Sequence, residues 1–157
     1  MATENKNLST YDKDSLPSVV GKRVGIITSQ WNGQITNNMR KGAVDTLLDC
    51  GFSPENIIEW SVPGAFELVN GAKRMIEKAV DAVIVIGCVI QGETKHFDFV
   101  CQGVTYGIAH LNATQDIPVI FCVLTDNTLQ QSIDRSGGKH GNKGIEAAIT
   151  AIQMIDL

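Results

Sequence analysis

A histidine follows a glycine-rich turn at the start of a predicted helix, a pattern that suits proton transfer beside a bound anion. Gly92 allows close approach of the backbone, Thr94 offers a hydroxyl, and the free N–H groups of a helix start could hold a phosphate or carboxylate. His96 has an unperturbed pKa of about 6.5, which suits it for moving protons. A plain helix cap at Thr94 and a structural histidine remain alternatives, and Glu93 opposes an anion unless its side chain points away.

Aromatic side chains follow the predicted strands at positions where a solvated loop would not need them. Trp31 comes shortly after the first strand and could stack against a flat heteroaromatic ring, or could pack over the edge of the sheet. Phe66 and Phe121 could form further walls of such a site, or could belong to the core. These positions therefore suggest, without requiring, a pocket for an aromatic ligand.

A basic cluster at residues 135–144 precedes the last predicted helix. Arg135 is the residue type suited to bidentate recognition of a phosphate, although the segment also fits a solvated loop. Glu146, early in the helix, could orient a histidine or complement the positive end of the helix dipole. The cluster is thus a second candidate for binding an anion.

Short β-branched runs alternate with segments of helical periodicity, and this alternation predicts the elements that position these side chains. The predicted strands are residues 24–28, 57–62, 82–86 and 119–124. The predicted helices are residues 35–48, 66–78, 97–111, 129–133 and 143–154. Gly51 is expected to stop the first helix.

Unbroken apolar strands separated by helices indicate a parallel sheet covered on both faces. We therefore expect an α/β fold, a three-layer αβα sandwich of the flavodoxin-like kind with a four-stranded parallel sheet. Residues 1–157 are predicted to form a single domain, with residues 1–15 as a flexible N-terminal arm that ends in a strand pairing with a neighbouring subunit. Ligands bind such sheets at the carboxyl ends of the strands, where the glycine-rich and aromatic segments fall.

Composition excludes several classes of protein. The 157 residues include 13 Lys+Arg and 17 Asp+Glu, a net charge of −4, which argues against binding a nucleic-acid backbone. No apolar run reaches the ~18–20 residues of a membrane span, and residues 1–14 lack the apolar stretch of a signal peptide. The cysteines form no C-x-x-C pair, which predicts reduced thiols and no metal site; they are Cys50, Cys88, Cys101 and Cys122. A cytoplasmic protein without membrane contact is expected.

Three motifs strongly resemble those of the 6,7-dimethyl-8-ribityllumazine synthase family. They are residues 62–67 (VPGAFE), residues 87–94 (GCVIQGET) with 96–98 (HFD), and residues 141–148 (GNKGIEAA). The match runs in the family's order and spacing from about residue 15 to the C-terminus. It implies a transferase of riboflavin biosynthesis that condenses 5-amino-6-(D-ribitylamino)uracil with 3,4-dihydroxy-2-butanone 4-phosphate. Phosphate and water are released, and no metal or organic cofactor is implied.

The resemblance also implies roles for individual residues. His96 would transfer protons. The contacts of the pyrimidine and ribityl groups would be Trp31, Ala65, Phe66, Glu67, Cys88, Val89, Ile90 and, from a neighbouring subunit, Phe121. The contacts of the four-carbon substrate's phosphate would be Glu93, Thr94 and, again from a neighbour, Arg135, with Lys143 and Glu146 as auxiliary polar residues. Gln91 departs from the Arg of many relatives and removes a positive charge near the entrance.

Because the implied site borrows residues from a neighbour, the resemblance makes a homopentamer the minimum active unit. Some family members stop at pentamers, and others assemble twelve pentamers into an icosahedral shell. The short segment 137–141 favours the shell. Riboflavin synthase is a partner that the resemblance allows.

Two rival functions on the same fold are disfavoured by single segments. A flavin-binding electron carrier would need a hydroxyl-rich phosphate loop after the first strand, where residues 29–33 supply only one hydroxyl. A receiver-type signalling module would need acids where Thr28, Ser29, Gly87 and Cys88 stand. A flavin-storage or shell-forming protein without synthase activity remains the alternative.

Overall fold

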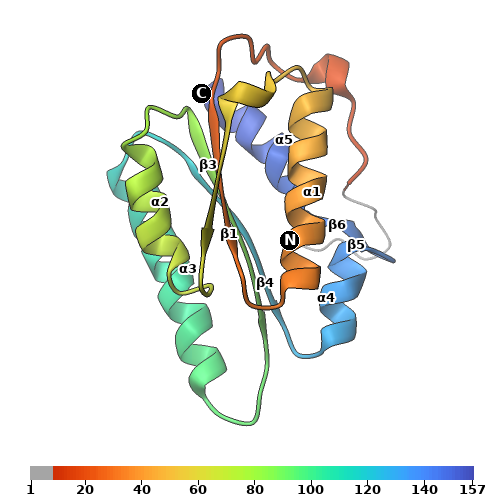
Figure 1. The fold of residues 1–157 in the computed structure, drawn as a ribbon, viewed down its shortest axis with the longest axis vertical. Helices are drawn as coiled ribbons and strands as arrows, with labels where there is room; N and C mark the ends of the chain where they lie inside the picture. The colour runs from red at the N-terminus through yellow and green to blue at the C-terminus, as the bar shows by residue number, and fades with distance from the viewer. Residues whose placement is uncertain (1–8) are drawn as a thin grey trace.

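The computed structural model describes residues 9–157, and its centre is a four-stranded parallel sheet (Figure 1). The strands are β1 (Val24–Ser29), β2 (Ile57–Val62), β3 (Ala82–Ile90) and β4 (Val119–Asp126). They lie in the order β2-β1-β3-β4, and each neighbouring pair is parallel. The predicted α/β fold with a four-stranded parallel sheet is therefore confirmed.

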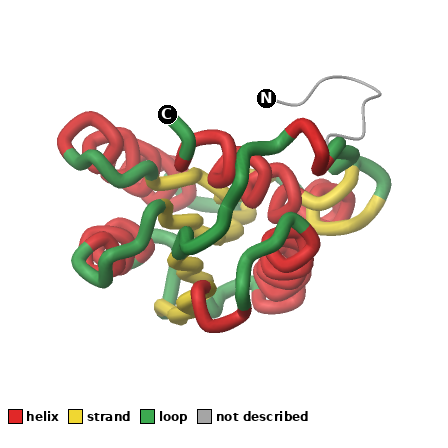
Figure 2. Tube along the Cα trace, turned by 90° about the horizontal axis from the view of Figure 1, so that it is seen from above, coloured by secondary structure: helices red, strands yellow, loops and turns green. Residues whose placement is uncertain are grey.

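Helices cover both faces of this sheet, as the view along the strands in Figure 2 shows. One face carries α2 (Leu68–Ile76) and α3 (His96–Thr114). The other carries α1 (Gly33–Asp49), α4 (Leu129–Arg135) and α5 (Lys143–Ile155). Successive strand residues point to opposite faces, so Ile26 joins the core under α1 and α5 whereas Ile27 joins the core under α2 and α3. All of β1 is buried because both faces are covered.

The layer of α1 and α5 is held by local caps and by one close approach of two helices. Gly51 has a φ of +100° and ends α1 as predicted, with its N–H donating to the carbonyl of Leu48. Asn142 caps α5 by accepting from the N–H of Gly144 at 2.8 Å. A Cβ on Gly144 would lie only 1.8 Å from the carbonyl oxygen of Met39, so only glycine lets α5 pack here against α1.

Most element boundaries differ from the sequence prediction by one to four residues, and three of these differences affect the carboxyl edge of the sheet. β3 continues to Ile90 and β4 to Asp126, because these two residues pair with each other. Residues 87–90 are therefore strand, not the loop that we expected. The helix predicted from residue 66 begins at Leu68, so Phe66 lies in a turn. That turn is closed by the carboxylate of Glu67, which accepts from the N–H of Gly64 at 2.9 Å.

A small antiparallel hairpin, β5 (Ser136–Gly138) with β6 (Gly141–Asn142), fills part of the segment for which a loop was expected.

Of the predicted N-terminal arm, residues 1–8 lie outside the described residues. Residues 9–20 form no strand within this chain, so the pairing of the arm with a neighbour stays a prediction. Two short 3-10 helices, η1 (Lys13–Ser15) and η2 (Pro54–Asn56), complete the described elements. No helix in residues 9–157 is both long enough and apolar enough for a membrane span.

Candidate active site

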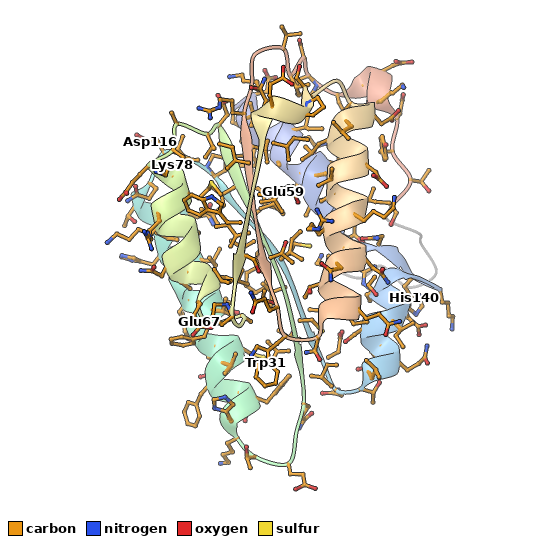
Figure 3. The ribbon with its side chains drawn as sticks, viewed as in Figure 1. Trp31, Glu59, Glu67, Lys78, Asp116 and His140 are labelled. Atoms are coloured by element: carbon orange, nitrogen blue, oxygen red, sulfur yellow. The ribbon has the colours of Figure 1, made fainter. Side chains whose placement is uncertain are left out.

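The strand order reverses between β1 and β3, and a pocket of about 650 Å³ lies at the carboxyl ends of these strands. Ligands of doubly wound sheets bind at this switch point. Figure 3 shows Trp31 and Glu67 toward this end of the molecule, with Lys78 and Asp116 at the opposite end. Eight predicted site residues line the pocket: Trp31, Ala65, Phe66, Glu67, Cys88, Val89, Ile90 and His96.

The pocket wall is rich in exposed aromatic rings. Trp31 is 72% exposed, Phe66 57% and Phe99 68%, although all three are large apolar side chains. Exposed apolar clusters of this kind around a hollow mark places where ligands or partners bind. Flat faces of indole and phenyl rings stack well on a heteroaromatic ring. The wall therefore suits a planar ligand such as a pyrimidine.

The loop that carries Trp31 is tied to both neighbouring strand ends. The N–H of Gln30 donates to Val62 at 2.9 Å, and the N–H of Trp31 donates to Pro63 at 3.3 Å. Asn32 has a φ of 56°, in the left-handed region, and its Nδ2 donates to the carbonyl of Cys88 at 2.9 Å. Asn adopts this conformation more readily than most residues. The position of the indole is thus set by the backbone around it.

Four pocket residues were missed by the sequence prediction: Asn32, Gly64, Phe99 and Val100. Phe99 lies three residues after His96 on α3, which places the two on neighbouring positions of one helix face. That spacing was a usable signal. Asn32 directly follows Trp31, but its role depends on a carbonyl 56 residues away along the chain. No local pattern in the sequence indicates that contact.

Cys88 is a buried thiol at the pocket that behaves as a hydrogen-bond donor. Its Sγ donates to the hydroxyl of Ser132 at 3.4 Å, and Ser132 Oγ donates to Asp126 Oδ2 at 2.7 Å. Burial raises the pKa of the Cys88 thiol; the Ser132 hydrogen bond lowers it, and the Asp126 charge raises it further. The thiol stays neutral near pH 7 and is not an activated nucleophile.

His96 is the first residue of α3 and lines the pocket with an exposed side chain. The backbone N–H of His96 donates a weak hydrogen bond of 3.4 Å to the hydroxyl of Thr94. Glu93 and Thr94 themselves are exposed in the turn before α3 and do not line the pocket. They lie next to the pocket only in the sense that His96, which lines it, follows Thr94 by two residues. Their role in binding a phosphate stays a prediction.

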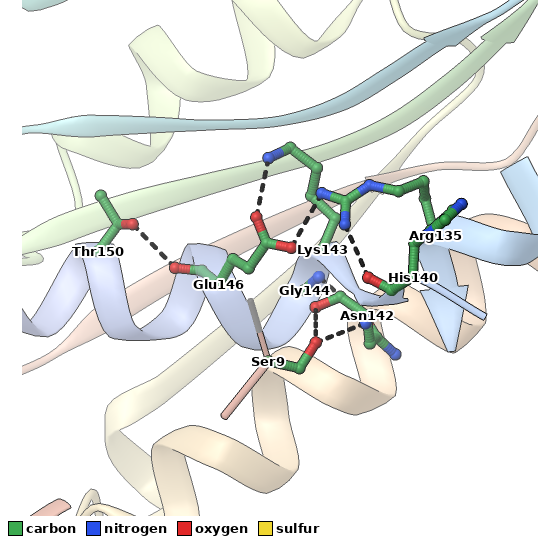
Figure 4. A network of polar contacts seen from close by, with 8 residues as sticks. All are labelled: Ser9, Arg135, His140, Asn142, Lys143, Gly144, Glu146 and Thr150. Atoms are coloured by element: carbon green, nitrogen blue, oxygen red, sulfur yellow. Dashed lines mark hydrogen bonds and ion pairs between the residues drawn. The ribbon is translucent and has the colours of Figure 1, made fainter. Parts of the chain in front are cut away.

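The basic cluster predicted near the C-terminus is a network of ion pairs, shown in Figure 4. Arg135 Nη2 contacts Glu146 Oε1 at 2.9 Å, and Lys143 Nζ contacts Glu146 Oε2 at 3.4 Å. Arg135 Nη1 also donates to the carbonyl oxygen of His140 at 2.9 Å. Glu146 therefore orients two cations, rather than a histidine side chain. Two positive charges on one carboxylate leave the cluster with a net positive charge.

This cluster lies on α4 and α5 and contributes no residue to the pocket. Lys143 and Glu146, together with Phe121 of β4, line a second hollow of about 390 Å³. It shares no residue with the first pocket and lies at β4, an edge strand of the sheet. Within one chain, the structure does not bring Phe121, Arg135, Lys143 or Glu146 to the pocket that Trp31 and His96 line. Among residues 9–157, no three His, Cys, Asp or Glu side chains are grouped as metal ligands.

A doubly wound α/β sandwich with an aromatic pocket at its switch point defines a class of small proteins that bind planar ligands at the sheet edge. The family model described as 6,7-dimethyl-8-ribityllumazine synthase matches residues 21–157 of this chain. The chain belongs to the 6,7-dimethyl-8-ribityllumazine synthase family, which confirms the resemblance of its motifs.

Relatives that carry this name match nearly the whole chain. The protein of Flavobacterium johnsoniae is 65% identical over 98% of this chain and 82% of its own length. The protein of Christiangramia forsetii is 57% identical, over 100% of this chain and 95% of its own length. That of Parabacteroides distasonis is 54% identical, over 99% and 98%.

Proposed function

We propose that the protein is a transferase of riboflavin biosynthesis that forms 6,7-dimethyl-8-ribityllumazine. It condenses 5-amino-6-(D-ribitylamino)uracil with 3,4-dihydroxy-2-butanone 4-phosphate and releases phosphate and water. Family membership and the shared name of relatives at 54–65% identity support this reaction. The observation that carries it is the aromatic pocket at the switch point, whose size and lining suit a pyrimidine with a ribityl chain.

In the proposed complex, Trp31 stacks on the pyrimidine ring. Phe66 forms a further aromatic wall, and residues 88–90 and Ala65 contact the ring and the ribityl chain. Glu67 offers a carboxylate that accepts hydrogen bonds from the polar edge of the substrate. Its Oε2 is already held by the N–H of Gly64, so the carboxylate is oriented before the substrate arrives. Such preorganisation reduces the cost of binding.

The chemistry requires little covalent help from the protein. The amine of the pyrimidine substrate attacks the ketone of the second substrate, so no Lys or Cys nucleophile is needed. The neutral Cys88 thiol is compatible with this scheme. Loss of water, loss of phosphate and ring closure each need protons moved, and His96 is the proposed group for these transfers. Holding the two reactants together supplies a further large part of the acceleration.

The phosphate half of the site is proposed to come from a neighbouring subunit. The residues that line the pocket include Glu67 but no Lys or Arg, so a phosphate dianion would lack a strong counter-charge there. The Arg135–Lys143–Glu146 cluster has a net positive charge and lies at the β4 edge with Phe121. A head-to-tail contact that placed this edge beside the next subunit's pocket would complete the site and would close into a ring.

We further propose that the ring is a homopentamer, and that the short segment 137–141 allows twelve pentamers to form an icosahedral shell. Glu93 and Thr94, beside the pocket, would help to hold the phosphate with Arg135. Riboflavin synthase is the partner proposed for such a shell. All four cysteines are unpaired, which fits the reducing cytoplasm as the place of action.

Mixing the purified protein with both substrates tests the reaction, because the lumazine product has its own absorbance. Product formation that requires both substrates is expected. A folded protein that forms no product, yet carries bound flavin or assembles into shells, would instead support storage or a structural role. Light scattering on the same sample reads the assembly separately. A single mass equal to that of a pentamer would exclude the shell and would leave the proposed reaction unaffected.

A further inference from the structure

Helix α3 carries two glycines, Gly103 and Gly107, on the face that it turns toward the segment 66–69. They lie four residues apart and therefore one turn apart on the same side of the helix. A Cβ on Gly103 would lie 2.6 Å from Cε2 and 3.2 Å from Cδ2 of the Phe66 ring. A Cβ on Gly107 would lie 2.5 Å from Cγ2 of Val69. Each glycine thus makes room for one particular side chain.

We propose that Gly103 is a positioning residue for the pyrimidine site, because the space left by its missing side chain seats the Phe66 ring. Phe66 lines the pocket, whereas Gly103 does not. Gly103 would act only through the ring, by setting how far this wall stands from Trp31. The inference rests on the proposed function, in which Phe66 contacts the pyrimidine substrate.

The backbone under Phe66 is fixed, so the seat decides where the ring lies. Ala65 is buried, and its carbonyl accepts from the N–H of Leu68 at 3.2 Å. The Gly64–Glu67 hydrogen bond closes the same turn. The ring itself is more than half exposed and is bounded on one side by α3. Its position is therefore more sensitive to a change in α3 than to small movements of its own backbone.

A methyl group on Gly103 would push the ring without disturbing the core. Carbon atoms in contact normally lie about 3.5–4.0 Å apart, so the ring would have to move by about 1 Å. The solvent side of the ring is open, and the displaced atoms are the far end of a side chain. Alanine is also a better helix former than glycine. Thermal stability should therefore be kept or raised while the pocket changes shape, a combination that a purely structural role would not produce.

Gly107 provides a matched control on the same helix. Gly107→Ala introduces the same methyl group one turn away, against Val69, which does not line the pocket. The substitution has the same effect on helix propensity and a similar degree of crowding. Any change that Gly103→Ala causes and Gly107→Ala does not must come through the pocket.

The experiment measures kcat and both KM values for wild type, Gly103→Ala, Gly107→Ala, Phe66→Ala and the double variant Gly103→Ala/Phe66→Ala. We expect Gly103→Ala to raise the KM for the pyrimidine substrate roughly fivefold or more, since a 1 Å misplacement can cost up to about 100-fold. The KM for the four-carbon phosphate should stay near that of wild type, and the melting temperature should stay the same or rise. Gly107→Ala should leave both KM values near those of wild type.

The double variant decides whether Gly103 acts through the ring. In the Phe66→Ala background, Gly103→Ala should have no further effect on the pyrimidine KM, because no ring remains to be displaced. An unchanged KM in the single variant, an equal rise in the Phe66→Ala background, or an equal rise for both substrates would each overturn the proposal. If wild type makes no lumazine, the proposed function fails. A crystal structure of Gly103→Ala then still shows whether the ring has left its seat.

Discussion

The side-chain amide of Asn32 donates a hydrogen bond of 2.9 Å to the carbonyl oxygen of Cys88, across the point where the strand order reverses. Asn32 is the N-cap residue of α1, at the end of the loop that follows β1, and Cys88 lies on the neighbouring strand β3. The bond joins the loop that carries Trp31 to the strand that carries residues 88–90. Two walls of the pocket are therefore held in one geometry by a single amide.

Asn32→Ala and Asn32→Gly should separate the bond from the backbone conformation. Asn32→Gly loses only the hydrogen bond, which is worth about 1 kcal/mol of the free energy of unfolding. Asn32→Ala also forces a Cβ-bearing residue without a polar side chain into the left-handed region, at a cost of about 1 kcal/mol more. Urea unfolding should rank wild type above Asn32→Gly, and Asn32→Gly above Asn32→Ala. Both variants should raise the KM for the pyrimidine substrate; equal stability of the two would contradict the argument.

His96→Ala should slow turnover by roughly 10²–10⁴-fold if this side chain moves protons, because that is the usual contribution of a general acid or base. Measurable activity should remain, since the pocket still holds the two substrates together. Steady-state assays of kcat check this. Lys95→Ala is the control, because Lys95 precedes His96, is exposed and does not line the pocket. Turnover of His96→Ala at the wild-type rate would remove His96 from the mechanism.

Arg135→Ala should raise the KM for the four-carbon phosphate at least about tenfold, which corresponds to ~1.4 kcal/mol of lost binding. The KM for the pyrimidine should change little. Arg135→Lys retains the charge but loses the bidentate fork, so an intermediate value is expected. Both KM values are measured with the other substrate saturating. Similar increases for the two substrates would argue that Arg135 stabilises the fold through Glu146 rather than binding phosphate.

Mixed oligomers should show whether one site uses two chains. Trp31→Ala impairs the pocket side, and Arg135→Ala impairs the β4 side. Dissociating and reassembling an equal mixture would place two intact halves together in about a quarter of the sites. Activity should then exceed that of either variant alone. Activity that stays at the level of the separate variants would place the whole site within one chain.

Cys122 should make the protein lose stability in alkali. Burial raises the pKa of its thiol to about 12 from an ordinary value of 9.0. The neutral thiol therefore stabilises the folded state fully below pH 9, and this contribution is lost as the pH rises toward 12. Each pH unit in that window corresponds to about 1.4 kcal/mol. Urea unfolding at pH 8, 9.5 and 10.5 should show a shallower decline for Cys122→Ala than for wild type or for Cys101→Ala; parallel declines would refute this.

The sequence predicts where the strands of the sheet begin, because a buried parallel strand needs an unbroken apolar run. Each of the four β-branched runs begins at the first residue of a strand. The end of β3 is less predictable, since residues 87–90 are strand only through their pairing with β4. Phe66 was wrongly placed in a helix for a similar reason, because the N–H of Gly64 donates to the carboxylate of Glu67 and closes a turn where helical periodicity continues. Contacts that are distant along the chain decide both.

The residues of the candidate site also differ in whether the sequence alone predicts them. Trp31 and His96 are found from residue type and from the rule that ligands bind at the carboxyl edge, whereas Glu67 is found only through the family resemblance. Asn32 is missed because its partner Cys88 is distant in sequence. The glycine–glycine–lysine run before residue 140 contains no β-branched residue, so nothing local predicts the β5–β6 hairpin.

The close packing of α5 on α1 has a consequence for synthesis of the chain. The sheet face under these helices is completed by Ala148, Ala151 and Ile152 of α5, which are synthesised after all four strands of the sheet. The backbone N–H of Asn142 donates a hydrogen bond to the hydroxyl of Ser9, 133 positions earlier, and this hydroxyl donates to the carbonyl oxygen of Asn142. This face of the sheet thus stays partly uncovered until α5 has been synthesised. Chaperones should bind the nascent polypeptide at that face, and premature aggregation should start there.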